Sequence, residues 1–111
     1  MMSGLVSVII PSVDRPERLR KAIYSIMSTA PGCEIVTVLE TGDTESIEAA
    51  EGTVIFTLSN HRELNTAELW NYGAVMASGE YLVVGADDVL FRPGWLEAAF
   101  RAMHEIGGSG I

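Results

Sequence analysis

Residues 5–32 read LVSVIIPSVDRPERLRKAIYSIMSTAPG, and this stretch predicts a buried strand followed by a helix. Leu5–Ile10 is short, rich in β-branched residues and almost continuously apolar, as is typical of a strand in a parallel sheet. Residues 14–17 (DRPE) then predict a helix start, with Asp14 as the cap and Glu17 closing a capping box. The apolar face of that helix follows at helical spacing: Leu19, Ala22, Ile23, Ile26 and Met27.

The same alternation recurs three more times along the chain. The further predicted strands are Ile35–Leu39, Val54–Leu58 and Tyr81–Val84. The further predicted helices are one around Thr44–Glu51 led by Asp43, one from the capping box at Asn65 and Glu68 to Gly79, and one between Pro93 and Gly107. Their predicted inward residues are Leu69, Gly73, Met76 and Ala77, then Leu96, Ala99, Phe100 and Met103. This order predicts an α/β fold, with a parallel sheet of about four strands and alternating helices, in one domain over residues 1–111.

The composition fits a globular domain and excludes some partners. The 111 residues, 48% of them apolar, are enough for one buried core. Seven basic and fifteen acidic residues give a net charge of −8. Such a surface repels nucleic-acid phosphates and anionic lipid, so we expect neither as a partner. If the ligand is itself an anion, a cation must lie between it and the protein.

The cysteine, histidine and hydropathy patterns also exclude several classes. A single cysteine, Cys33, rules out an intrachain disulfide framework and cysteine-rich zinc motifs. The two histidines, His61 and His104, are far apart in the chain. The sequence has no apolar run long enough for a membrane helix and no basic leader before its first apolar stretch. These features predict a cytoplasmic protein with no transmembrane segment.

The residues after the predicted strands locate the expected site, because ligands of open α/β sheets bind at the carboxyl ends of the strands. Five acids follow three of these strands: Asp14, Glu40, Asp43, Asp87 and Asp88. Adjacent carboxylates repel each other unless they are solvated or bridged by a cation. Oxygen-rich sites of this kind suit Mg²⁺ or Mn²⁺ completed by substrate phosphates and water.

Common nucleotide and phosphate motifs are missing. No GxGxxG follows the first strand and no GxxxxGK[ST] occurs, which argues against a dinucleotide site and a P-loop. A phosphoacceptor receiver domain would need an aspartate after the third strand and a late lysine. Instead the third strand is followed by Ser59 and Asn60, and the only lysine is Lys21.

Two stretches resemble family 2 glycosyltransferases with the GT-A fold. They are VSVIIPSVDRPERLRKAI at residues 6–23 and WNYGAVMASGEYLVVGADDVLFRPGWL at residues 70–96. The second stretch includes Asn71 and Gly73, which match the family's Asn-x-Gly, and a DXD-like metal motif. The resemblance implies transfer of a sugar from a nucleotide-diphosphate donor, of the UDP type, to an acceptor hydroxyl. It also implies inversion at the sugar carbon and a divalent cation, Mn²⁺ or Mg²⁺.

The resemblance also implies which residues bind the nucleotide. Pro11 and Ser12 would lie against the base. Glu40 falls where the family has an aspartate that recognises a uracil-type base, and Asp43 is a rival for that role. Asn65 is near a position that contributes to the base pocket. Val13 stands where an aromatic residue often stacks on the base.

The metal motif is carried by Asp87 and Asp88. By resemblance, Asp87 would contact the ribose or the metal shell, and Asp88 would ligate the metal that bridges the diphosphate. Ala86 replaces the first acid of a full DXD motif. We therefore expect Asp88 to be the main metal ligand.

The sequence departs from the family in length. Family members continue with an acceptor-binding half that holds the general base, and no residue here matches that base, so the catalytic residue is unassigned. The chain is then a fragment, a short protein completed by another, or a non-catalytic nucleotide-binding or interaction module. An uncompleted sheet would expose an edge and an apolar face, which predicts self-association as a homo-oligomer.

For several residues a plain structural role competes with the functional one. Helix capping accounts for Asp43 about as well as base recognition does. Arg15 and Arg62 are either phosphate ligands or ordinary surface arginines. His61 is interpreted as an ordinary loop histidine. Trp95 either packs in the core or lines the sugar pocket.

Overall fold

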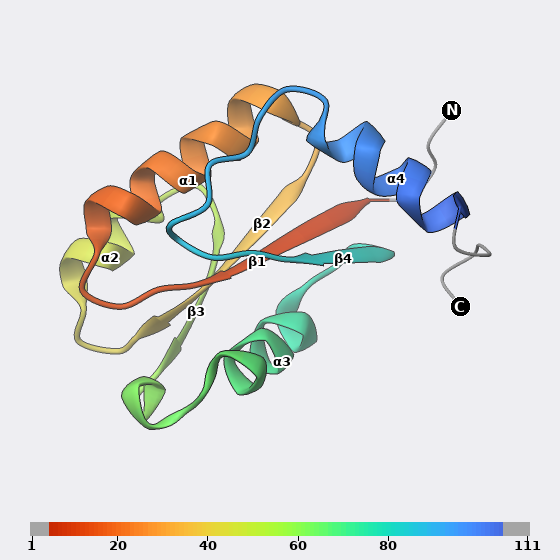
Figure 1. Cartoon of the computed structure of the whole chain (residues 1–111). Helices are drawn as coiled ribbons and strands as arrows, with labels where there is room; N and C mark the ends of the chain where they lie inside the picture. The colour runs from red at the N-terminus through yellow and green to blue at the C-terminus, as the bar shows by residue number, and fades with distance from the viewer. Residues whose placement is uncertain (1–4, 106–111) are drawn as a thin grey trace.

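The computed structural model describes residues 5–105 of the chain (Figure 1). The strands are β1 (Val6–Pro11), β2 (Glu34–Glu40), β3 (Val54–Leu58) and β4 (Tyr81–Val84). The helices are α1 (Pro16–Thr29), α2 (Thr44–Ala49), the short 3₁₀ helix η1 (His61–Glu63), α3 (Thr66–Met76) and α4 (Trp95–Glu105). The predicted alternation of strands and helices is confirmed, and β3 and β4 have the predicted bounds.

The four strands form one sheet in the order β3-β2-β1-β4, and all neighbouring pairs are parallel. The register places Val8 of β1 between Ile35 of β2 and Val83 of β4. Residues Val6–Ile10 are all buried, as expected for the central strand of a sheet covered on both faces. The predicted parallel α/β fold is therefore correct.

Helices cover both faces of this sheet (Figure 1). Side chains alternate between the faces of a strand, so Val8 and Ile10 face α1 and α2 while Ile9 faces α3. The larger core cluster lies between the sheet and α1 and includes Leu19, Ile26 and Leu39. None of the helices within residues 5–105 is long and apolar enough to cross a membrane.

Gly73 allows α3 to pack closely on the sheet. It is buried, and a Cβ atom at this position would overlap the Cγ2 atom of Ile9 and lie 3.0 Å from the Cγ2 atom of Val38. Only a residue without a side chain lets the helix backbone come this near to β1 and β2. The sequence prediction that Gly73 faces inward is confirmed.

Several local predictions are wrong. Asp14 does not cap α1, because the helix begins after Arg15 and its first turn has no side-chain cap. Met27 and Met76 were predicted to face the core, but both are exposed, so the apolar stripes of α1 and α3 are narrower than expected. Helix α3 ends at Met76 rather than near Gly79. The predicted stop at Gly107 lies outside the described residues.

Candidate functional site

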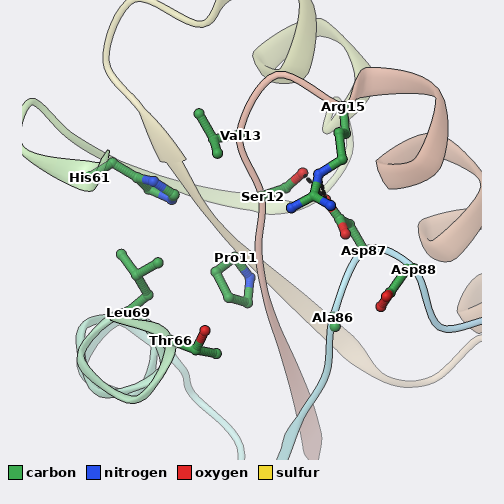
Figure 2. Close-up of a pocket in the computed structure, with 10 residues that line it drawn as sticks. All are labelled: Pro11, Ser12, Val13, Arg15, His61, Thr66, Leu69, Ala86, Asp87 and Asp88. Carbon is green, nitrogen blue, oxygen red and sulfur yellow. Dashed lines mark hydrogen bonds and ion pairs between the residues drawn. The ribbon is translucent and has the colours of Figure 1, made fainter. Parts of the chain in front are cut away.

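The carboxyl ends of β1 and β4 lie side by side and open onto a pocket (Figure 2). The loops that follow these strands form one wall of the pocket, and η1 with the first turn of α3 forms the other. Its volume is about 220 Å³. We call it the rim pocket, and its lining residues are Pro11, Ser12, Val13, Arg15, His61, Thr66, Leu69, Ala86, Asp87 and Asp88.

Asp87 is almost fully buried at the junction of the two loops, with 5% of its surface exposed. Its Oδ2 atom accepts a hydrogen bond of 2.7 Å from the Ser12 hydroxyl. The same oxygen lies 3.3 Å from Nε of Arg15. A buried carboxylate requires such partners, since an unpaired charge away from water is costly. The structure therefore brings Ser12 and Asp87 together and supplies a cation for Asp87.

Asp88 differs from its neighbour. Its side chain is exposed at the border of the rim pocket, and no hydrogen bond or ion pair joins it to another residue within the described range. No group of three or more His, Cys, Asp or Glu side chains in that range could hold a metal ion. These residues fit a Mg²⁺ or Mn²⁺ ion only if one carboxylate shares it with phosphate oxygens and water. They do not fit an ion held by the protein alone.

His61 was interpreted as an ordinary loop histidine, but the structure places it in the wall of the rim pocket. Only 3% of its surface is exposed. Its Nε2 atom lies 2.9 Å from the carbonyl oxygen of Val38, which also accepts from the backbone N–H of Ser12 at 3.1 Å. A carbonyl can only accept, so Nε2 carries the proton. Nδ1 is buried and has no hydrogen-bond partner among the described residues. One carbonyl of β2 thus fixes both walls of the pocket.

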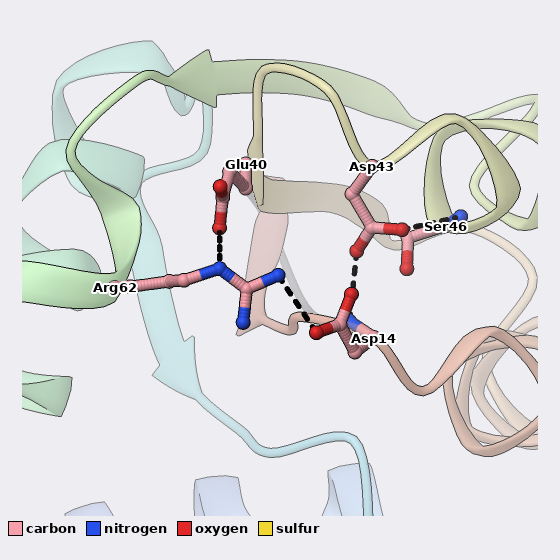
Figure 3. Close-up of polar contacts among 5 residues, drawn as sticks. All are labelled: Asp14, Glu40, Asp43, Ser46 and Arg62. Carbon is pink, nitrogen blue, oxygen red and sulfur yellow. Dashed lines mark hydrogen bonds and ion pairs between the residues drawn. The ribbon is translucent and has the colours of Figure 1, made fainter.

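Three acids and one arginine, from the segments at the ends of β1, β2 and β3, form a second cluster at the carboxyl edge (Figure 3). Arg62 reaches Asp14 at 2.7 Å and also pairs with Glu40. Asp14 has a φ of 58°, a left-handed conformation that costs energy for a residue other than glycine. We call Asp14, Glu40, Asp43 and Arg62 the arginine cluster. None of the four lines the rim pocket.

Asp43 holds the base of this cluster. It caps α2 by accepting a hydrogen bond from the backbone N–H of Ser46, and it accepts another of 2.8 Å from the backbone N–H of Asp14. Burial raises the pKa of Asp43, but these hydrogen bonds and the nearby charge of Arg62 outweigh that effect and lower it. The carboxylate therefore stabilises the folded loops in its ionised form.

Asn65 has a capping role. Its side chain accepts from the backbone N–H of Glu68, and Glu68 accepts from the backbone N–H of Asn65, so the predicted capping box is confirmed. Asn65 does not line the rim pocket, whereas its neighbour Thr66 does. Trp95 donates a hydrogen bond to Thr29 at the far end of α1, so it packs in the core and is absent from the pocket lining.

Three polar residues that line the rim pocket were not predicted as site residues. The role of Arg15 was left open, and neither His61 nor Thr66 was assigned to the site. The only available signal was position, since each follows the end of a strand or a loop that returns to the same edge. Residue type alone gave no reason to prefer them over other polar residues.

Comparisons with known proteins show the family of the chain and support its fold. The sequence model of the family described as "Glycosyl transferase family 2" matches residues 7–111. A solved structure of S. aureus TarS, residues 1–349, is similar in fold, with a TM-score of 0.66 and 16% sequence identity. The match covers 96% of this chain and 38% of that one, so this chain spans well under half of its structural neighbour. No curated protein matches the sequence.

Proposed function

The chain belongs to glycosyltransferase family 2, and from this premise we propose that it is the donor-binding part of a glycosyltransferase. The proposed donor is a nucleotide-diphosphate sugar of the UDP type, and the sugar passes to an acceptor hydroxyl with inversion. The observation that carries the proposal is the rim pocket, where a free carboxylate, Asp88, stands beside a neutralised one, Asp87. The cytoplasmic location stays a prediction.

The walls of the rim pocket suggest where the nucleotide lies. Pro11, Val13 and Leu69 offer apolar surface for the flat base, and His61 lines the same pocket. The paired Asp87 stands between this surface and Asp88, where the ribose would follow the base. Binding of the base by Glu40, Asp43 or Asn65 stays a prediction. Binding by Glu40 would require that carboxylate to release Arg62.

The proposed cation is Mg²⁺ or Mn²⁺, since members of this family generally use a divalent metal. Asp88 would hold it together with the diphosphate, and Asp87 would support that ligand shell. A phosphate oxygen about 4 Å from a bare carboxylate is repelled by about 4 kcal/mol at an effective dielectric near 20. When bound, the cation neutralises the charge that builds up on the departing nucleoside diphosphate.

The chain's own residues prepare this site. Ser12 and Arg15 hold the Oδ2 atom of Asp87, so that carboxylate cannot turn away from the pocket. The Arg15 charge also lowers the repulsion that an approaching diphosphate meets. None of the described residues can be assigned as the general base for the acceptor hydroxyl. We therefore place the general base outside these 111 residues.

The test is a calorimetric titration of the chain with UDP, in Mn²⁺ and in chelator, together with assays of hydrolysis and transfer from UDP-glucose. We expect Mn²⁺-dependent binding of UDP. Binding without turnover, even with an added acceptor-binding half, would favour the alternative of a non-catalytic nucleotide-binding module. Equal affinity for UDP in Mn²⁺ and chelator would contradict the metal site.

Self-association belongs to the same proposal. Within residues 5–105, strand β4 pairs only with β1, so it forms an edge of the described sheet, and its residues Leu82 and Val84 are exposed. An apolar edge strand favours pairing with another chain. Light scattering at high protein concentration should show a dimer or larger species, and a monomer throughout would contradict this part.

A further inference from the structure

Basic residues are concentrated on one helix of this acidic chain. Four of its seven Lys and Arg residues lie within residues 15–21, at the start of α1. Arg15 pairs with Asp87, and Arg20 pairs with Glu17 at 2.7 Å. Arg18 and Lys21 are exposed, and neither forms an ion pair with any residue that the structure describes. In a chain of charge −8, two unpaired cations side by side mark a place where an anion is attracted.

These two cations line a groove between α1 and the segment that follows β4. A hollow of about 380 Å³ is bordered by Arg18, Lys21, Leu90 and the Asp87–Asp88 pair. A second, apolar hollow of about 470 Å³ adjoins it, and its lining residues are Arg20, Lys21, Tyr24, Ser25 and Leu90. Lys21 and Leu90 border both hollows, so the two adjoin each other. We call them together the α1 groove.

The walls of the α1 groove are fixed to each other. The backbone N–H of Phe91 donates a 2.9 Å hydrogen bond to the Ser25 hydroxyl of α1. One turn further along, the indole N–H of Trp95 donates to Thr29 at 2.8 Å. The rings of Phe91 and Trp95 pack edge to face and lie against the core of the α1 face. The segment after β4 is therefore held along α1.

The groove changes character along its length. Arg18, Lys21 and Tyr24 follow each other at intervals of three residues, so they lie along one side of α1 over about 9 Å. At the far end, Tyr24 is 71% exposed and Leu90 is 58% exposed. At the near end, Asp87 and Asp88 border both the groove and the rim pocket. The order is thus apolar surface, then cations, then the free carboxylate.

We propose that the α1 groove binds an amphiphilic phosphate, namely a hydroxyl-bearing head group joined through a phosphate to an apolar chain. The phosphate lies on Arg18 and Lys21, since the guanidinium fork and the ammonium group both suit phosphate oxygens. The apolar chain covers Leu90 and Tyr24, whose exposed carbon surface gains from leaving water. The head group then points to Asp88.

An amphiphile fits better than the other anions. Free phosphate would leave the apolar hollow empty, and a neutral lipid would leave both cations unused. A flat anionic membrane would face the remaining acidic surface as well as this groove, and the net charge of −8 opposes that contact. We further infer that this amphiphile is the acceptor, whose hydroxyl would then lie near Asp88. This step rests on the proposed function, because it depends on a donor sugar in the rim pocket.

The probe for this site is n-octyl phosphate below its micelle concentration, titrated into the 111-residue chain by calorimetry. Inorganic phosphate and n-octyl glucoside each carry only one of the two recognised features, and we expect both to bind at least tenfold more weakly. Equal binding of inorganic phosphate or of octyl glucoside would overturn the proposal. So would stronger binding to vesicles of phosphatidylglycerol, or no binding of octyl phosphate at all.

Variants assign the binding to the groove. We expect the double variant Arg18→Gln, Lys21→Gln to bind octyl phosphate at least tenfold more weakly, and Leu90→Ser to lose the advantage of octyl phosphate over inorganic phosphate. Arg101→Gln is the control, because Arg101 is an exposed arginine on α4 outside the groove. An equal loss in Arg101→Gln would show a general charge effect and overturn the proposal.

Failure here is distinguishable from failure of the proposed function. UDP binding in Mn²⁺ is measured on the same Leu90→Ser protein, whose substitution lies outside the rim pocket. If Leu90→Ser binds UDP with wild-type affinity and the wild-type chain does not bind octyl phosphate, only the proposed α1 groove site is rejected. Octyl phosphate binding with no UDP binding would reject the donor site alone.

Discussion

The two sides of the carboxyl edge use their carboxylates in opposite ways. On the side of β2 and β3, the acids of the arginine cluster are tied to Arg62 or to backbone N–H groups of neighbouring loops. On the side of β1 and β4, Asp87 is tied to Ser12 and Arg15, but Asp88 is free beside a pocket. The position of an acid at a strand end therefore does not identify a ligand site. The proposed metal site rests instead on a carboxylate that is both unpaired and beside a pocket, Asp88.

The largest expected effect separates Asp88 from Asp43. Asp88→Asn keeps the shape of the side chain and removes its charge, so we expect it to abolish Mn²⁺-dependent binding of UDP while the fold remains intact. Asp43→Asn removes a charge that serves the loops, and we expect it to keep that binding. Calorimetric titration with UDP, with circular dichroism to check the fold, measures both.

The outcome decides whether the comparison stands. Wild-type affinity in Asp88→Asn would show that this strand end is not a metal site. Loss of UDP binding in a folded Asp43→Asn variant would support the alternative that Asp43 recognises the base.

The next largest effect concerns Asp87, the buried neighbour of Asp88. Ser12→Ala removes the hydroxyl that donates to Asp87 and leaves that buried carboxylate with Arg15 alone. We expect the free energy of unfolding to fall by about 1–3 kcal/mol, the usual result of leaving a buried polar atom unsatisfied. Urea denaturation measures it, with Ser28→Ala on the exposed side of α1 as the control. Equal stability of the two variants would mean that the Ser12 contact does not hold Asp87.

A pH dependence tests the arginine cluster. The pKa of Asp43 is lowered in the folded protein, so its ionised form contributes stability above the pKa of the unfolded chain, near pH 4. This contribution is lost as the pH falls through the lower folded value. Asp43→Asn lacks it, so its urea midpoint should fall less between pH 7 and pH 3 than that of the wild type. Glu45→Gln, an exposed acid on the same helix, should keep the wild-type fall.

The smallest effect is expected at Arg62. The side chains of Arg62 and Asp14 are more than half exposed, and Glu40 is partly buried. Ion pairs of an exposed arginine contribute little and are screened by salt. Arg62→Gln should lower the thermal midpoint slightly at low salt and not at high salt, relative to Arg101→Gln. A large loss of stability that is independent of salt would show that Arg62 closes this side of the edge by more than charge.

The local elements were predictable because each depends on residues close together in the sequence. Val54–Leu58 is a strand because it is short and apolar, and α3 begins at Asn65 because Asn65 and Glu68 can bond to each other's backbone. Periodicity also gave the parallel sheet, since short strands alternating with helices have few other arrangements. The predicted cap of α1 was wrong because contacts distant in the sequence hold Asp14. Asp14 reads as a cap but makes its bonds across the edge, to Arg62 and Asp43.

By itself the sequence determined the α/β class, the strands, the capping box of Asn65 and Glu68, and the set of acids at the carboxyl edge. Only the tertiary structure decided which of those acids is free, because their partners come from distant parts of the chain. Ser12 and Asp87 are separated by 75 residues, and Arg62 and Asp14 by 48. No sequence spacing encodes such contacts, since they depend on β4 and β2 lying on opposite sides of β1. The strand order thus left Asp88 as the unpaired carboxylate, between the rim pocket and the α1 groove.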